Sequence, residues 1–274
     1  MTSIQPSAHL WGRSLAAALL VSGLALGCGP AEVAGDAEQG TLMLVANGEE
    51  FVRDGFTTKD GWDIRFDQVL VTLADVEAHQ TDPPFDPASN EGLQATETVV
   101  LLAEPMTVDL TATAGDEEVV MVSESAAPVG HFNAVSWNVV LAEDGEAAGA
   151  AIALFGQATK DGRTVDFTLR LEQPLSYTCG EFVGDERKGI VTAAAAADTE
   201  VTFHFDHIFG DADLPEGDEL NVGALGFEPL AALAAGDTLN ADLATLEAEL
   251  SPEDYATLAD AIANLGHVGE GHCR

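Results

Sequence analysis

Histidines in two short clusters are the residues of this sequence best suited to chemistry. The first cluster is His204 and His207, at the end of a run of alternating apolar residues. The second is His267 and His272, which lie among glycines close to the end of the chain. Neutral imidazoles, supplemented by a carboxylate, are ligands that zinc and copper prefer in proteins. The sequence therefore predicts a site for a transition metal ion, zinc or copper, built from these four histidines.

One geometric condition applies to the first cluster. Side chains alternate along a strand, so His204 and Asp206 would share one face while His207 would lie on the other. Both imidazoles can reach one ion only where the strand ends or bulges, and Gly210 favours an ending close by. Asp206 is then a further candidate ligand, or a partner that orients a histidine.

Three other interpretations of these residues stay open. His131, at the start of a β-type run, is an additional candidate ligand, although a lone histidine there is more often a surface residue. The acidic loop after Gly210 offers oxygen ligands of the kind that calcium prefers, but its spacing does not fit the EF-hand template, so calcium is the weaker candidate. The histidines could also be two separate features that bind no metal.

The sequence contains none of the common catalytic motifs. There is no GxSxG nucleophile elbow, no phosphate-binding P-loop, no GxGxxG after a strand and no HExxH. We therefore expect a binding protein in preference to an enzyme, and assign no catalytic residue. A surface interaction or adhesion module with incidental histidines is one alternative. A metal-dependent hydrolase is another, because three histidines and an open coordination position would suffice for it.

The first 27 residues have the three parts of an export signal. A weakly basic start carries Arg13, an apolar run covers residues 15–26, and a glycine precedes Cys28. The run is too short to span a bilayer comfortably, which favours a cleaved signal over an anchor helix. The segment Leu24–Cys28 resembles the lipobox of bacterial lipoproteins, which implies lipidation of Cys28. Gly29 in place of Asp implies, by the same resemblance, an outer-membrane lipoprotein facing the periplasm or the cell surface.

The two remaining cysteines are expected to form a disulfide. Cys179 and Cys273 are an even pair in an oxidising compartment once Cys28 carries lipid. The bond would close a loop of more than ninety residues and stabilise the fold by about 4 kcal/mol on the chain-entropy estimate. Because His272 precedes Cys273, the bond would also bring the second histidine cluster back against the middle of the chain.

The net charge excludes two classes of partner. The chain has 47 Asp and Glu against 10 Lys and Arg, a formal charge of −37, which becomes −38 when the signal with Arg13 is removed. Such a protein is repelled by nucleic acid and by anionic lipid headgroups. We expect membrane contact only through the N-terminal lipid, no nucleic-acid partner, and an envelope protein partner of unspecified kind.

The elements that must position these residues are mainly strands. From Thr41 to about Ile208, β-branched and aromatic residues alternate with polar ones between turn signals, which predicts an antiparallel β-sandwich. After Gly210 the pattern predicts a small helical hairpin packed on it, with helices at 230–234, 240–250 and 252–265. The predicted organisation is a signal peptide (1–27), a lipidated flexible tether (28–40), a β-sandwich domain (41–210) and a loop and helical extension with a histidine-rich tail (211–274).

Two segments carry a resemblance to a known group of proteins. Residues Gly55–Glu77 and Pro128–Asn133 are similar to the opening strands of uncharacterised bacterial envelope lipoproteins with a prealbumin-like β-sandwich domain. That resemblance implies a sandwich fold and an envelope location. It implies no site residues.

Overall fold

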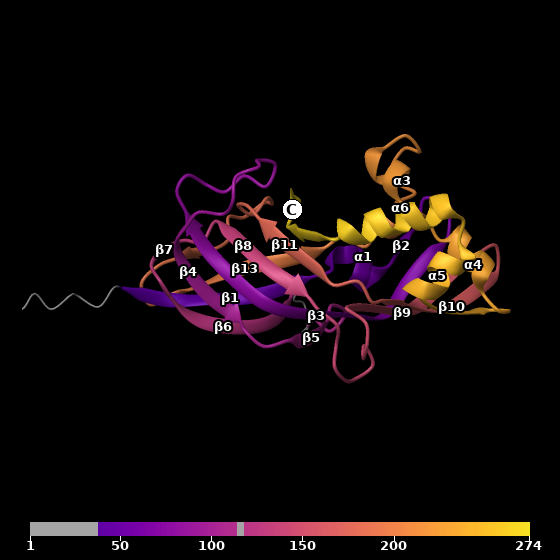
Figure 1. Cartoon of the computed structure of the whole chain (residues 1–274), viewed down its shortest axis with the longest axis horizontal. Helices are drawn as coiled ribbons and strands as arrows, with labels where there is room; N and C mark the ends of the chain where they lie inside the picture. The colour runs from indigo at the N-terminus through magenta and orange to yellow at the C-terminus, as the bar shows by residue number, and fades with distance from the viewer. Residues whose placement is uncertain (1–37, 114–117) are drawn as a thin grey trace, which may run out of the picture. The chain divides into compact units, whose positions relative to one another are not determined.

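The computed structural model describes residues 38–113 and 118–274 (Figure 1). The expected signal peptide, Cys28 and most of the expected tether lie outside these residues. Within them the chain is mainly β with a few short helices, which confirms the predicted fold class. No helix in the described ranges is long and apolar enough to cross a membrane.

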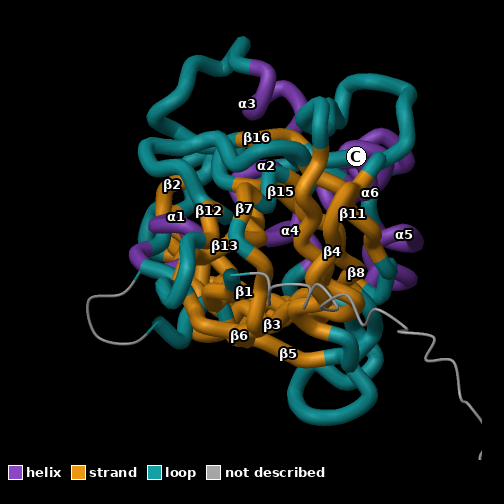
Figure 2. The backbone as a smooth tube through the Cα atoms, turned by 90° about the vertical axis from the view of Figure 1, so that its left-hand side faces the viewer, coloured by secondary structure: helices purple, strands orange, loops and turns teal. Residues whose placement is uncertain are grey.

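Two large sheets account for most of the strands (Figures 1 and 2). The five-stranded sheet has the order β16 (Gly271–His272), β15 (Gly266–Val268), β13 (Ala196–Phe203), β1 (Gln39–Asn47) and β6 (Val120–Pro128). The nine-stranded sheet has the order β11 (Leu175–Cys179), β8 (Ala134–Val139), β3 (Asp63–Thr81), β9 (Ile152–Lys160), β10 (Arg163–Leu171) and β14 (Thr238–Asp242). Three further strands also pair with β3, namely β2 (Phe56–Thr57), β4 (Ala95–Leu102) and β5 (Met106–Asp109). A separate short ladder joins β7 (Gly130–His131) and β12 (Ile190–Val191).

Most of these pairings are antiparallel, as the sequence predicts. Two are parallel, β1 with β13 and β10 with β14. The long strand β3 covers two segments that the sequence pattern separates, because shifts in its register between Phe66 and Gln68 and between Ala74 and Glu77 let it bend and serve several partners.

One apolar core fills the space between the sheets. Leu42 and Leu44 of β1 belong to the same buried cluster as Trp137 of β8, and the ring centroids of Trp137 and Phe203 lie 6.5 Å apart. Burying a side chain of this kind stabilises the fold by about 1.5–3 kcal/mol. The sandwich therefore provides a rigid base on which the ends of its strands can be held in place.

The predicted strand from Glu200 to Ile208 is wrong beyond Phe203, where β13 ends. The chain turns instead into the short helix α2 (Asp206–Phe209). This turn places Phe205 and Phe209 one helical turn apart, and both are fully buried in the core. Gly210 then takes a φ of 67°, which a glycine adopts without strain, and its N–H donates to the Asp206 carbonyl at 2.6 Å.

The predicted helix at 240–250 is wrong in its first part. Residues up to Asp242 form β14, in which Leu239 and Ala241 alternate into the core beside β10. The Asp242 carboxylate then accepts a hydrogen bond from the Thr245 N–H at 2.8 Å and begins α5 (Leu243–Glu249).

The predicted helix at 252–265 is observed as α6 (Pro252–Ala263). The Ser251 hydroxyl accepts a hydrogen bond from the Asp254 N–H at 3.1 Å, as expected for an N-cap. Two further short helices are α3 (Glu219–Gly223), in a stretch where the sequence predicts a loop, and α4 (Glu228–Leu233). Helix α6 contacts both α2 and α3, and it delivers the chain directly to β15.

The C-terminal residues join the two sheets. Cys179 of β11 and Cys273 form a disulfide, with their Cα atoms 4.4 Å apart. Thr178 and Arg274 exchange two backbone hydrogen bonds beside it, at 2.8 and 3.1 Å. Because β15 and β16 belong to the five-stranded sheet, the segment is held to both sheets at once.

Candidate metal centre

The end of β13 brings the first two histidines together. The His204 N–H donates to the Leu265 carbonyl at 3.0 Å, and the His207 N–H donates back to the His204 carbonyl at 3.3 Å. Their ring centroids lie 5.6 Å apart, and ligand atoms of His204, Asp206 and His207 all lie within 4.8 Å of one another. The condition that the strand must end here is therefore met, and these three residues form a group that could hold a metal ion.

The second histidine cluster lies against the first, as the predicted disulfide requires. His267 is in register with Thr202 of β13, and His272 pairs with His267 across the β15–β16 turn. The His267 ring centroid lies 4.3 Å from that of His204, 5.0 Å from that of His207 and 4.9 Å from that of His272. Figure 2 shows α2, β15 and β16 side by side at this end of the sheet.

Backbone carbonyls orient two of the rings. Nε2 of His204 lies 3.1 Å from the Gly269 carbonyl oxygen, and Nε2 of His267 lies 3.2 Å from that of Asn264. A carbonyl can only accept, so Nε2 carries the hydrogen in both rings and Nδ1 keeps its lone pair when the ring is neutral. Fixing one ring nitrogen on a carbonyl is the usual way in which proteins present the other to a metal.

Two carboxylates lie near Nδ1 of His204 at the centre of the cluster. Nδ1 of His204 lies 3.5 Å from Oε2 of Glu49 and 3.9 Å from Oδ1 of Asp206. Oδ1 of Asp206 and Nδ1 of His267 are buried and have no hydrogen-bond partner among the described residues. Leaving such a group unsatisfied costs about 1–3 kcal/mol. A cation bound in the group formed by His204, Asp206 and His207 would satisfy the Asp206 oxygen.

The surroundings keep two of the imidazoles neutral. Burial, together with the neighbouring His204, His207 and His272, lowers the pKa of His267 to about 3. Burial also lowers the pKa of His207. The pKa values of Asp206 and Glu49 are raised, mainly by burial. Lone pairs on neutral rings are what a metal ion requires, and a bound cation would favour the charged form of the carboxylates.

Glu49 is the site residue that sequence reasoning missed. It begins α1 (Glu49–Asp54) with a φ of 60°, and its N–H donates to Oδ1 of Asn47 at 2.7 Å. Its position opposite His204 depends on the parallel pairing of β1 with β13, which no local pattern announces. Only the turn-like Asn47-Gly48 pair next to it is visible in the sequence.

The other candidate ligands lie outside this cluster. The His131 ring is near Glu181, at 4.0 Å, and Arg187, at 3.3 Å. In the acidic loop proposed for calcium, the Asn221 side chain bonds to the backbone of Asp211, accepting from its N–H and donating to its carbonyl, each at 2.8 Å. That amide is therefore engaged in closing the loop.

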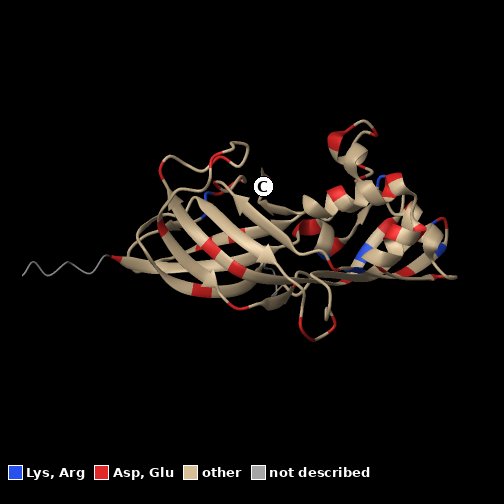
Figure 3. Cartoon of the chain, in the orientation of Figure 1, with Lys and Arg blue, Asp and Glu red and all other residues tan. Residues whose placement is uncertain are grey.

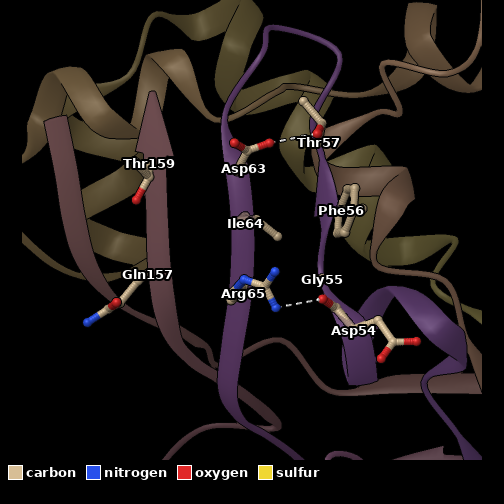
Figure 4. Close-up of a pocket in the computed structure, with 9 residues that line it drawn as sticks. All are labelled: Asp54, Gly55, Phe56, Thr57, Asp63, Ile64, Arg65, Gln157 and Thr159. Carbon is tan, nitrogen blue, oxygen red and sulfur yellow. Dashed lines mark hydrogen bonds between the residues drawn. The ribbon is translucent and has the colours of Figure 1, made fainter. Parts of the chain in front are cut away.

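A cavity of about 390 Å³ borders the cluster and is lined by His207, His272, Glu219, Leu220, Asp260 and Asn264, together with Gly223 and Ala261. A larger cavity, of about 510 Å³, lies over β2, β3 and β9 (Figure 4). Two of its polar groups are bonded within it, since Thr57 Oγ1 donates to Asp63 Oδ1 at 2.7 Å and Arg65 donates to the Asp54 carbonyl at 3.1 Å.

Comparison with known proteins adds nothing to this description, because no protein-family model, curated protein or solved structure matches the chain. The fold and the cluster define a β-sandwich protein with a buried histidine and carboxylate group that could hold a metal ion.

Proposed function

We propose that this protein binds one transition metal ion, zinc or copper, through His204, His207, His267 and Asp206. Glu49 and His272 complete the surroundings of the ion. The observation that carries the proposal is the group of ligand atoms that His204, Asp206 and His207 place within 4.8 Å of one another, with the His267 ring centroid 4.3 Å from that of His204. Imidazole nitrogens with one carboxylate suit borderline metals and not calcium.

Elemental analysis of the untagged protein tests this proposal. After dialysis against a buffer that contains trace zinc or copper, we expect close to one metal ion for each native chain. A His204→Ala/His267→Ala double variant should retain much less metal. His131→Ala is the matched control, because it removes an imidazole outside the cluster. Circular dichroism and thermal unfolding verify that each variant folds. A native protein without metal, or a double variant that retains it, would reject the proposal.

We further propose that the protein is an exported lipoprotein anchored in the outer membrane through Cys28, of the kind that the resemblance implies. The signal-like residues 1–27 and the Cys179–Cys273 disulfide support this location, since structural disulfides persist in oxidising compartments. The excess of acidic over basic residues, marked along the chain in Figure 3, supports a membrane contact through lipid alone and no contact with nucleic acid. An unidentified envelope protein completes the expected partners.

Metabolic labelling with palmitate tests the lipid anchor. We expect the label to be lost in Cys28→Ala and retained in Cys179→Ser/Cys273→Ser.

A hydrolytic use of the same centre has one supporting observation, the cavity beside His207 and His272. A metal with an open position can activate water there. Hydrolysis of p-nitrophenyl acetate by the zinc-loaded protein, compared with the His204→Ala/His267→Ala variant, tests it. Equal rates for the two proteins would reject a hydrolase.

A further inference from the structure

A buried threonine of β13, two residues before His204, is linked to that histidine through one glycine. Thr202 is fully buried, and its Oγ1 accepts a hydrogen bond from the Gly269 N–H at 2.9 Å. The Gly269 carbonyl in turn accepts from Nε2 of His204 at 3.1 Å. Gly269 lies in the turn between β15 and β16, so the position of this turn determines where the His204 ring finds its acceptor.

The backbone at Gly269 has a second support. The Glu270 N–H donates to the Val183 carbonyl at 2.9 Å, and the Val183 N–H donates to the Val268 carbonyl at 3.2 Å. The N–H and the carbonyl of a planar trans peptide point in opposite directions, so the bond from Glu270 to Val183 directs the Gly269 carbonyl toward His204. Gly269 has a φ of 58°, and a Cβ there would collide with the Val183 carbonyl oxygen, so this close approach requires glycine.

A buried carboxylate fixes the direction of the Thr202 hydroxyl. Thr202 Oγ1 donates to Oε1 of Glu200 at 3.1 Å, and Glu200 is 4% exposed. The hydroxyl hydrogen is used in this bond, which leaves an oxygen lone pair for the Gly269 N–H. Oε2 of Glu200 lies 2.9 Å from Nζ of Lys188. Both oxygens of Glu200 therefore have partners, and the carboxylate is a firmly placed acceptor for Thr202.

The tautomer of His204 decides whether its ring can bind an ion. Oε2 of Glu49 and Oδ1 of Asp206 lie 3.5 and 3.9 Å from Nδ1 of His204. A hydrogen on Nδ1 can be donated toward these carboxylates, whereas a hydrogen on Nε2 is donated to the Gly269 carbonyl. Only the second tautomer leaves the Nδ1 lone pair available on the side where Asp206 lies. The bond to Gly269 therefore competes with the attraction of the two carboxylates.

We propose that Thr202 is a positioning residue for the metal centre. By holding Gly269 in place it keeps the hydrogen of His204 on Nε2 and the lone pair of Nδ1 available to the ion. The inference rests on the metal site proposed above and adds to it a residue that does not itself touch the ion. Residues that orient a metal ligand through hydrogen bonds typically change metal affinity by about 10–100-fold when mutated.

NMR of the metal-free full chain measures the tautomer, because protonated and unprotonated ring nitrogens of a neutral histidine differ strongly in chemical shift. At alkaline pH we expect the native protein to carry the hydrogen on Nε2 of His204. Thr202→Val has a similar shape but cannot accept from Gly269, so the form with hydrogen on Nδ1 should appear. The same variant should bind Zn²⁺ about tenfold more weakly, measured by calorimetry. Thr202→Ser retains the hydroxyl and should restore both the tautomer and the affinity.

Thr199→Val is the matched control. Thr199 is also buried, three residues earlier in β13, and its side chain therefore lies on the opposite face of the sheet. We expect this variant to keep the native tautomer and Zn²⁺ affinity, and circular dichroism verifies that each variant folds. Glu200→Asp is a second test should Thr202→Val fail to fold. It withdraws the acceptor from Thr202 while keeping a negative charge near Lys188, and should move the tautomer in the same direction.

The outcomes separate this inference from the metal site itself. A hydrogen on Nδ1 of His204 in the native protein would overturn this inference alone. A tautomer and a Zn²⁺ affinity that stay unchanged in Thr202→Val, or in Glu200→Asp where that variant is used, would do the same. A native protein that shows the Nε2 tautomer but binds no Zn²⁺ would instead overturn the metal site on which the inference rests.

Discussion

Replacing Asp206 with asparagine is expected to stabilise the metal-free protein and to weaken its metal binding. The Asp206 side chain is buried, its Oδ1 has no hydrogen-bond donor among the described residues, and it faces Nδ1 of His204 at 3.9 Å. An asparagine amide at this position can donate toward His204 or Glu49. The substitution therefore relieves an unsatisfied acceptor while removing a charged ligand.

The size of both effects follows from the burial. Satisfying one buried acceptor is worth about 1–3 kcal/mol in the unfolding free energy of the metal-free protein. For a domain of this size each kcal/mol raises Tm by about 2–4 °C. Mutating a residue that only hydrogen-bonds to a metal ligand typically weakens metal affinity by about 10–100-fold. Losing the Asp206 carboxylate, a ligand itself, is therefore expected to weaken it by about 100-fold or more.

Thermal unfolding with and without metal measures both effects in one assay. In excess chelator, Asp206→Asn should melt at a higher temperature than the native protein. At a free zinc concentration of 100 times the native Kd, the native protein gains about 2.7 kcal/mol, whereas a variant with 100-fold weaker binding gains about 0.4 kcal/mol. The order of the two melting temperatures should thus reverse, or the gap between them nearly close, when metal is added.

One result would refute this reasoning. If Asp206→Asn lowers Tm by the same amount with chelator and with zinc, the carboxylate is a structural acceptor for backbone N–H groups and not a metal ligand. Phe209→Ala in the same core provides a reference for a purely structural loss.

Three other outcomes are expected. Cys179→Ser/Cys273→Ser should lower the unfolding free energy by about 4 kcal/mol, measured by denaturant titration. The same variant should bind metal more weakly, measured by calorimetry, because the disulfide next to His272 no longer holds that residue in place. An unchanged metal affinity would contradict this expectation. Burial lowers the pKa of His79, which bonds to Thr98 and Ser136, so the folded state binds fewer protons, and stability should fall as pH drops below about 6.5 toward the folded pKa. Between pH 7.5 and 5, the unfolding free energy measured by denaturant should change less in His79→Gln than in the native protein. An equal change in the two proteins would contradict a role for His79. Phe209→Ala should lower the unfolding free energy by about 3–5 kcal/mol, measured by denaturation in chelator. A loss below about 1 kcal/mol would show that neighbouring side chains fill the space left by the removed ring.

The parts of the fold that depend on local chemistry could be predicted from the sequence. The Ser251 cap and Pro252 mark the start of α6 within the sequence itself, and turn signals mark the hairpins of the sandwich. The proximity of the two histidine clusters could also be predicted. The number of cysteines is enough to predict the Cys179–Cys273 disulfide, and this bond brings His272 back against the middle of the chain.

What could not be predicted depends on partners distant in sequence. Asp242 begins α5 only because the preceding residues are used as a strand by β10. Glu49 reaches His204 only because β1 lies parallel to β13. The end of β13 at Phe203 is set by the burial of Phe205 and Phe209 in a core made by other strands, and an alternating apolar run cannot reveal this.

The histidine and carboxylate group draws its members from α1, from the turn after β13, and from α2, β15 and β16, which meet only in the finished fold. No short peptide cut from this chain can reproduce it, so an ion captured there would report native structure as a whole. Such an ion binds the folded chain and not the unfolded one. It would therefore mainly slow unfolding and lengthen the lifetime of the folded protein, while the folding rate would change little.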